Sequence, residues 1–228
     1  MNWLLILVII LFLGSTYSGY RKGLFKTIFS IASIIIAILI TTFVSPYIAK
    51  QINGNVGINS KIREQVIGLI DNCIEKMSDE EQEEFIDNMP VPKYIKGYLK
   101  KNNNLQVYQE RSLDSFSEYI VDELVRIIIN LITFVIVYFA IRIGLLIVTI
   151  MGNIITKLPV IEQFDGMGGT LLGGVQGIIE IWILFIIITF LSQTEFGMSA
   201  MRCIENNTIL SILYDNNVIM RIMYQFMM

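Results

Sequence analysis

The stretch GGTLLGGVQG, residues 168–177, decides the fold class of this chain. It is rich in glycine and runs directly into IIEIWILFIIITFL, residues 178–191, a markedly apolar segment. Glycine in a helix interior costs roughly 1 kcal/mol relative to alanine, so a soluble helix gains nothing from this composition. In a bilayer, small residues let two helix backbones approach closely, which favours their association. The stretch therefore predicts the start of a membrane helix that packs against another helix.

The glycines of this stretch recur at a spacing of four. Gly169, Gly173 and Gly177 consequently fall on one helix face. We expect this glycine zipper to be a helix-packing stripe, and we expect its partner to be the small-residue face of an earlier segment, formed by Ser30, Ser33 and Ala37. A phosphate-binding loop is the competing interpretation, but the stretch lacks the Lys-Ser/Thr pair of a P-loop and no strand pattern precedes it.

The composition of the whole chain agrees with a membrane protein. Hydrophobic residues make up 54% of the 228 positions and charged residues only 16%, against about 25% charged residues in soluble domains. The apolar residues gather in segments that predict membrane-spanning helices at 3–19, 24–44, 127–151 and 170–191. A signal peptide fits the first segment less well, because its basic pair follows the apolar run. The net charge of −3 gives no support for nucleic-acid binding.

The segments order the chain into two hairpins, an insertion and a tail. We predict an all-α membrane protein with a transmembrane hairpin at 1–49, a polar and mostly helical extramembrane region at 50–123, a second hairpin at 124–192 and an amphipathic, interfacial tail at 193–228. The second span is expected to end before Pro46, where helices commonly stop. In the insertion, one helical face is predicted from Ile62, Val66, Leu69, Ile70, Cys73 and Met77.

Two serines mark expected helix starts in the polar region. Ser78 precedes Glu81 by three residues, the spacing of a capping box, and Ser115 precedes Glu118 in the same way. The acidic run that follows Ser78 is most simply a solvated helix face. Calcium binding is the alternative, although the EF-hand spacing with its glycine is missing. Helical spacings in the tail are those of Ile209, Ile212, Leu213, Ile219, Ile222, Met223 and Phe226.

The chain contains no histidine, which limits its chemistry. A Ser-His-Asp or Cys-His nucleophile system cannot be built from its residues, and a His-ligated metal is excluded. Cys73 and Cys203 are too far apart in sequence for a CxxC site, and whether they form a disulfide stays open. We therefore expect no enzymatic activity, no cofactor and no metal.

Two charges interrupt the apolar segments. Arg142 lies in the third span and Glu180 in the fourth, at nearly the same depth if these spans are antiparallel. An unpaired charge at that depth is costly, so we predict a direct or water-bridged intramembrane charge pair, Arg142 with Glu180. Intramembrane charges also mark ion and solute pathways, so a small channel or transporter that uses the two residues is the alternative function.

Two patterns resemble the colicin V production (CvpA) family. GYRKGLFKTIFSIASIIIAILI, residues 19–40, resembles the family's junction between its first two spans, with Gly19, Arg21, Gly23 and Leu24 matching the motif. FDGMGGTLLGGVQGIIEIWILFIIITFLS, residues 164–192, resembles a second signature, in which Asp165 precedes the glycine series. The resemblance implies a multi-pass protein of the bacterial inner membrane, without enzymatic activity, that supports toxin production or secretion and envelope maintenance. Its expected partners are the lipid bilayer and another protein or a second copy.

The basic residues also suggest an orientation in the membrane. Arg21, Lys22 and Lys26 flank the turn at residues 18–24, and the N-terminal tail carries no basic residue. The positive-inside rule therefore predicts that the turn is cytoplasmic and that the N-terminus is outside.

Overall fold

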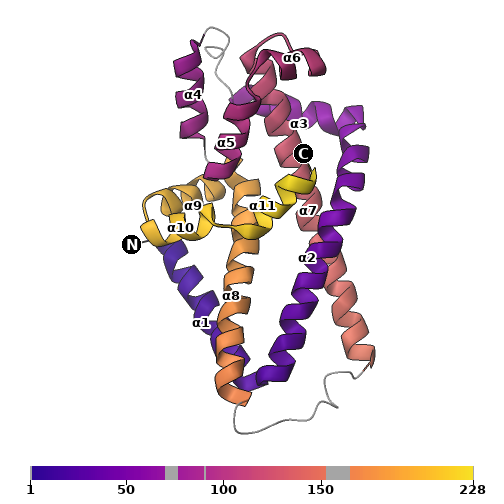
Figure 1. The fold of residues 1–228 in the computed structure, drawn as a ribbon, viewed down its shortest axis with the longest axis vertical. Helices are drawn as coiled ribbons and strands as arrows, with labels where there is room; N and C mark the ends of the chain where they lie inside the picture. The colour runs from indigo at the N-terminus through magenta and orange to yellow at the C-terminus, as the bar shows by residue number, and fades with distance from the viewer. Residues whose placement is uncertain (1, 70–76, 90, 153–164, 228) are drawn as a thin grey trace. The chain divides into compact units, whose positions relative to one another are not determined.

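The computed structural model describes residues 2–69, 77–89, 91–152 and 165–227, and these residues are predominantly helical (Figure 1). The longer helices are α1 (Trp3–Lys22), α2 (Leu24–Asn53), α7 (Phe116–Gly152) and α8 (Asp165–Phe190). Shorter helices lie between and after them: α3 (Val56–Leu69), α4 (Asp79–Asn88), α5 (Lys93–Asn102), α6 (Leu105–Arg111), α9 (Glu195–Glu205), α10 (Thr208–Asp215) and α11 (Val218–Met227).

In the described ranges, four helices are long and apolar enough to cross a membrane, and they are α1, α2, α7 over Phe116–Val148, and α8. No strand occurs among the described residues. The protein is an all-α membrane protein, as the sequence predicted. The helices extend beyond the predicted spans, because α7 begins eleven residues before Ile127, inside the predicted polar region. Residues 153–164, between α7 and α8, lie outside the described part.

The prediction that the helix of the second span stops before Pro46 is wrong. Helix α2 continues through Pro46 to Asn53. Proline removes one backbone N–H from a helix and crowds the preceding turn. Within membrane helices this cost is tolerated, because hydroxyl side chains and neighbouring helices satisfy the freed backbone groups. The carbonyl that Pro46 leaves without its helical donor is that of Thr42, and the side chain of Thr42 donates to the Ile38 carbonyl at 2.9 Å.

The chain forms two compact units. The first comprises Met1–Ser45 and Phe134–Met228, and it contains α1, α8 and the tail helices. In this unit α1 and α8 run antiparallel in direct contact, and α9 to α11 gather at the end of the pair near the N-terminus (Figure 1). Its core includes Leu4, Phe185 and Ile186, each fully buried. This pair of helices therefore positions the glycine stripe.

The second unit, Pro46–Thr133, contains the polar region. Its α4 begins with the predicted capping box, since Ser78 Oγ accepts from the Glu81 N–H and the Glu81 carboxylate accepts from the Ser78 N–H at 2.7 Å. The predicted start at Ser115 is also confirmed, because its Oγ accepts from the Glu118 N–H at 3.2 Å and α7 follows. In α3 the side chain of Val66 is buried. Ile62 and Met77 of the predicted face are half-buried, and Ile70 and Cys73 lie outside the described residues.

Candidate functional site: the first turn and the glycine face

The turn between α1 and α2 is closed by a residue far away in the sequence. Gly23 separates the two helices with φ +81°, a left-handed conformation that side chains rarely adopt. The first N–H groups of α2 have no partner within the helix, and Gly23 offers no capping side chain. Asp165 supplies it, because its Oδ1 accepts from the Leu24 N–H at 2.6 Å.

Asp165 is also the first residue of α8, so its carboxylate lies at the N-terminal ends of two helices. Both helix dipoles favour a negative charge there. A Cβ built on Gly23 would lie 1.8 Å from Asp165 Oδ2, so a side chain at position 23 and the Asp165 carboxylate cannot occupy this place together. The structure thus brings together Gly23, Leu24 and Asp165, which the sequence placed in two separate motifs.

Next to this turn, α1 and α8 meet backbone to backbone. A Cβ on Gly19 would lie 2.2 Å from the Gly169 carbonyl oxygen and 2.7 Å from Gly173 Cα. A Cβ on Gly173 would lie 2.6 Å from the Ser15 carbonyl oxygen, and one on Gly177 would lie 3.3 Å from Phe12 Cα. Only residues without a side chain allow this approach. The stripe Gly169, Gly173 and Gly177 therefore faces α1 along about two turns.

The prediction that the glycine stripe packs against the small-residue face of the second span is wrong. Ser30, Ser33 and Ala37 lie on α2, whereas the stripe lies against Ser15, Gly19 and their neighbours on α1. The physical reason is that small residues at helical spacing identify a face but not its partner. Ser15, Gly19 and Gly23 themselves form a row at a spacing of four, and this signal could have identified α1. On α2, Ala37 is fully buried and Ser30 and Ser33 are half-buried.

The two intramembrane charges have separate polar partners. The Glu180 carboxylate accepts from Ser15 Oγ at 2.5 Å and from Gln176 Nε2 at 2.7 Å. Arg142 Nη1 donates to Ser33 Oγ on α2. Among the described residues no ion pair joins Arg142 to Glu180, so the direct pair expected from their equal depth is not formed in the structure. Equal depth does not determine the direction in which each side chain points. Glu180 follows Gly177 by three residues and therefore lies on the glycine face toward α1.

Arg21, the remaining motif residue, is exposed in the last turn of α1 beside Lys22. Cations at a helix C-terminus interact favourably with the helix dipole. The structure gives Arg21 no role in the contact between Gly19 and Gly169.

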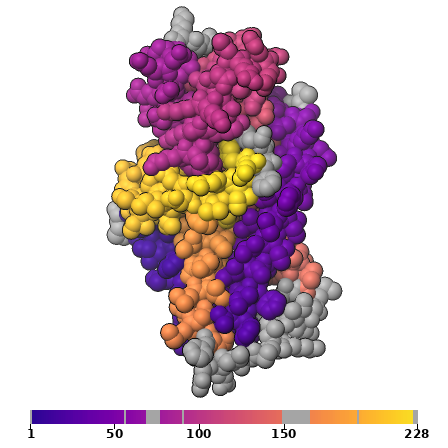
Figure 2. Space-filling view, in the orientation of Figure 1, coloured from indigo at the N-terminus to yellow at the C-terminus, as the bar shows by residue number. Residues whose placement is uncertain are grey.

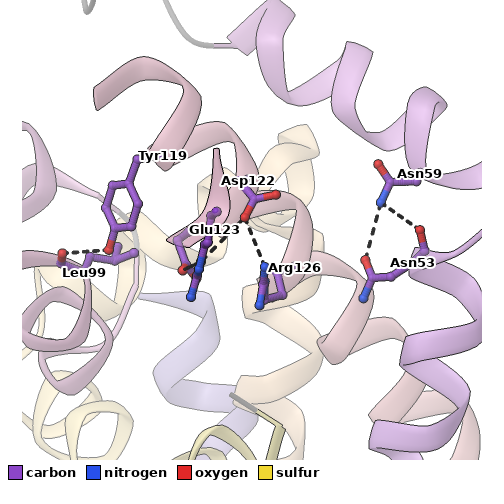
Figure 3. A network of polar contacts seen from close by, with 8 residues as sticks. Asn53, Asn59, Leu99, Tyr119, Asp122, Glu123 and Arg126 are labelled. Atoms are coloured by element: carbon purple, nitrogen blue, oxygen red, sulfur yellow. Dashed lines mark hydrogen bonds and ion pairs between the residues drawn. The ribbon is translucent and has the colours of Figure 1, made fainter. Parts of the chain in front are cut away.

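The polar unit contains an ion cluster that the sequence reasoning missed. Arg111 of α6 contacts Glu123, whose side chain is fully buried in α7, and lies 3.5 Å from Asp122. Asp122 in turn accepts from Arg126 Nη2 at 3.1 Å (Figure 3). The available signal was the Asp122–Arg126 spacing of four, which is typical of a helix-surface ion pair. The cluster holds α6 against α7 and stabilises the buried carboxylate.

Aromatic residues surround this cluster. The Tyr119 hydroxyl donates to the Leu99 carbonyl at 2.8 Å (Figure 3), and its ring lies 5.7 Å from the Tyr108 ring. Burial raises the pKa of Tyr98 on α5, and the nearby Glu123 carboxylate raises it further. Burial beside the cluster therefore disfavours the ionised form of the Tyr98 hydroxyl.

No group of three or more His, Cys, Asp or Glu residues that could hold a metal ion occurs in the described ranges. The acidic side chains of α4 from Asp79 to Glu81 are exposed. Cys203 is a free, half-buried thiol. Cys73 lies outside the described residues, and the structure describes no disulfide at Cys203.

Comparison with protein families gives a match to one model, described as Colicin V production protein, over residues 4–71. The match contains the complete first-turn motif from Gly19 to Leu24 and does not reach Asp165. Searches of curated proteins and of solved structures gave no match. The family resemblance seen in the motifs is confirmed over the matched part: residues 4–71 of this chain match the model of the colicin V production (CvpA) family.

Proposed function

We propose that the protein is a non-enzymatic, multi-pass protein of the bacterial inner membrane that supports toxin production or secretion, and envelope maintenance, through protein contacts. The observation that carries the proposal is the turn where Asp165 caps α2 beside Gly23, within the hairpin that matches the family model. Such a closed hairpin is a rigid unit, and rigid helix faces suit contacts with a partner protein or a second copy.

A complementation experiment tests this function. The gene is deleted from its host, and the strain is complemented with the native protein, with Gly173→Ala or with Gly174→Ala. Toxin release is measured by growth inhibition of a sensitive strain. We expect the native protein and Gly174→Ala to restore release and Gly173→Ala to restore less, because of these two positions 173 alone faces backbone atoms at under 3.0 Å. Equal toxin release with and without the gene would refute the function. In-membrane crosslinking of the same strains identifies the partner.

The proposed orientation places the turn around Lys22 in the cytoplasm and the N-terminus outside. Single cysteines at position 22 and at position 85, in a background with Cys73 and Cys203 replaced by serine, are labelled with an impermeant thiol reagent in intact cells. We expect labelling at 85 and none at 22. The reverse pattern would contradict this orientation.

A small channel or transporter is the second candidate. It is favoured by the separate partners of Arg142 and Glu180, since each charge is hydrogen-bonded to a neutral side chain. Charges without a structural ion pair inside apolar helices are candidates for transport. Ion flux into proteoliposomes tests this function. Flux that disappears in Glu180→Gln but persists in the matched Gln176→Glu/Glu180→Gln variant would support it, and absence of flux with the native protein would rule it out.

A further inference from the structure

The tail helices form hydrogen bonds with the C-terminal part of α8. Trp182 Nε1 donates to the Leu213 carbonyl of α10 at 3.1 Å, and Asn217 Nδ2, before α11, donates to the Trp182 carbonyl at 2.8 Å. Further along α8, the Thr189 and Tyr214 hydroxyls are 2.9 Å apart. The contacts of α10 and of the start of α11 therefore extend from residue 182 to residue 189 of a candidate span.

The lengths of α8 and α1 give the depth at which the tail contacts α8 in a membrane. Trp182 lies seventeen residues after Asp165, or about 26 Å along α8 at a rise of about 1.5 Å per residue, and Thr189 lies about 36 Å along it. With the charged first turn at one edge, a hydrocarbon core of about 30 Å ends between these two residues. Helix α1 gives the same level, because Trp3 is about 28 Å from Lys22 and its ring lies 5.3 Å from that of Phe196 on α9. The tail thus crosses the boundary between hydrocarbon and headgroups.

Several apolar side chains of the tail remain exposed after it has packed against α8. On α10, Leu210 and Tyr214 are buried, whereas Ile209 and Ile212 are 59% and 56% exposed. At 100° per residue, Ile209 and Ile212 lie within about 60° of each other, beside the buried face. Phe196 and Val218 are exposed apolar residues of α9 and α11. In Figure 2 the tail forms a continuous band across α8.

We propose that α9–α11 lie in the membrane interface of one leaflet and that Ile209 and Ile212 contact lipid acyl chains. Depth selects lipid as the occupant, because these residues belong to a helix bonded to Trp182, on the hydrocarbon side of the boundary. Both tryptophans of the chain, Trp3 and Trp182, lie near this boundary, where aromatic residues are enriched in membrane proteins. The proposal rests on the multi-pass arrangement proposed above.

Spin labels in lipid nanodiscs test the proposal. Cysteines are introduced singly at 209, 212, 175 and 205 in the full chain, with Cys73 and Cys203 replaced by serine, and power saturation compares collisions with oxygen and with an aqueous nickel chelate. Val175 is an exposed position of α8 about 15 Å from Asp165 and reports whether α8 spans. Glu205, exposed at the end of α9, is the aqueous control.

We expect labels at 209, 212 and 175 to collide mainly with oxygen, and the label at 205 mainly with the nickel chelate. Labels at 209 and 212 that behave like 205, with 175 in lipid, would overturn the tail proposal alone. Labels at 209 and 212 shielded from both reagents would show that protein covers the patch and would overturn lipid as its occupant. An aqueous label at 175 would overturn the spanning arrangement and the tail proposal with it.

Discussion

A pair of adjacent alanine substitutions measures how much the close approach of α1 and α8 contributes to stability. A Cβ at position 173 would lie 2.6 Å from the Ser15 carbonyl oxygen, and ordinary contact begins at 3.4 Å. The helices would therefore have to separate by about 0.8 Å, the difference between these distances, and no side chain can move aside because the obstructing atoms are backbone. At position 174 the nearest atom is Phe12 Cζ at 3.6 Å, which is ordinary contact.

The two substitutions share their effect on helix propensity. Each replaces a helical glycine with alanine, a gain of about 1 kcal/mol that cancels in the comparison. The difference that remains is the cost of overpacking, about 1–3 kcal/mol. We expect Gly173→Ala to be less stable than Gly174→Ala by this amount, and Gly174→Ala to equal or exceed the native protein.

Unfolding by SDS in mixed micelles, followed by circular dichroism, measures the free energies of unfolding. The native protein and both variants are titrated under one condition, and native-like spectra before titration establish that all three start folded. Equal free energies of unfolding for the two variants, or a less stable Gly174→Ala, would refute the backbone contact between Gly173 and Ser15.

Three further predictions concern the turn, the ion cluster and the acidic helix. Gly23→Ala should abolish folded yield in detergent, because it combines a φ of +81° with overlap on the Asp165 carboxylate; a normal yield would contradict this geometry. Arg111→Met should lower the free energy of unfolding in SDS by about 3–5 kcal/mol, because it leaves Glu123 buried without its partner. The double variant Arg111→Met/Glu123→Leu should recover most of this loss. Additive losses in the double variant would contradict the coupling between the two residues. The hydrogen bond from the backbone of Ser78 lowers the pKa of Glu81 from 4.5. The stabilisation of α4 by the Glu81 carboxylate is therefore complete above pH 4.5 and is lost as pH falls through the lowered pKa. An NMR titration of the Ser78 amide should show a midpoint below pH 4.5, and a midpoint at or above 4.5 would refute the lowered pKa.

The sequence was sufficient to predict which residues share a helix face, but not which helix that face contacts. The spacing of Gly169 and Gly173 encodes a face directly, since the α-helix repeats every 3.6 residues. The choice between α1 and α2 as the partner depends on tertiary packing, and two similar rows of small residues competed for it. Pro46 gives a second case, because the rule that helices commonly stop before proline predicted an end, whereas α2 continues to Asn53.

The polar contacts were least predictable where they join distant segments. The serine caps at Ser78 and Ser115 are local, and the sequence was sufficient to predict both. The bond from Leu24 to Asp165 and the contact of Arg111 with Glu123 depend on how the chain folds back. Equal depth suggested an Arg142–Glu180 pair, but the direction in which each side chain points was not contained in that argument.

The capping of α2 by Asp165 has a consequence for biosynthesis. The Leu24 N–H and its acceptor are 141 residues apart. At about 5–20 residues per second, a ribosome needs about 7–28 s to extend the chain from one to the other. The first hairpin must therefore enter the membrane with its turn open, and the late arrival of residue 165 locks a structure begun many seconds before. A ribosome that stalls between the two positions leaves this nascent chain with an uncapped first turn.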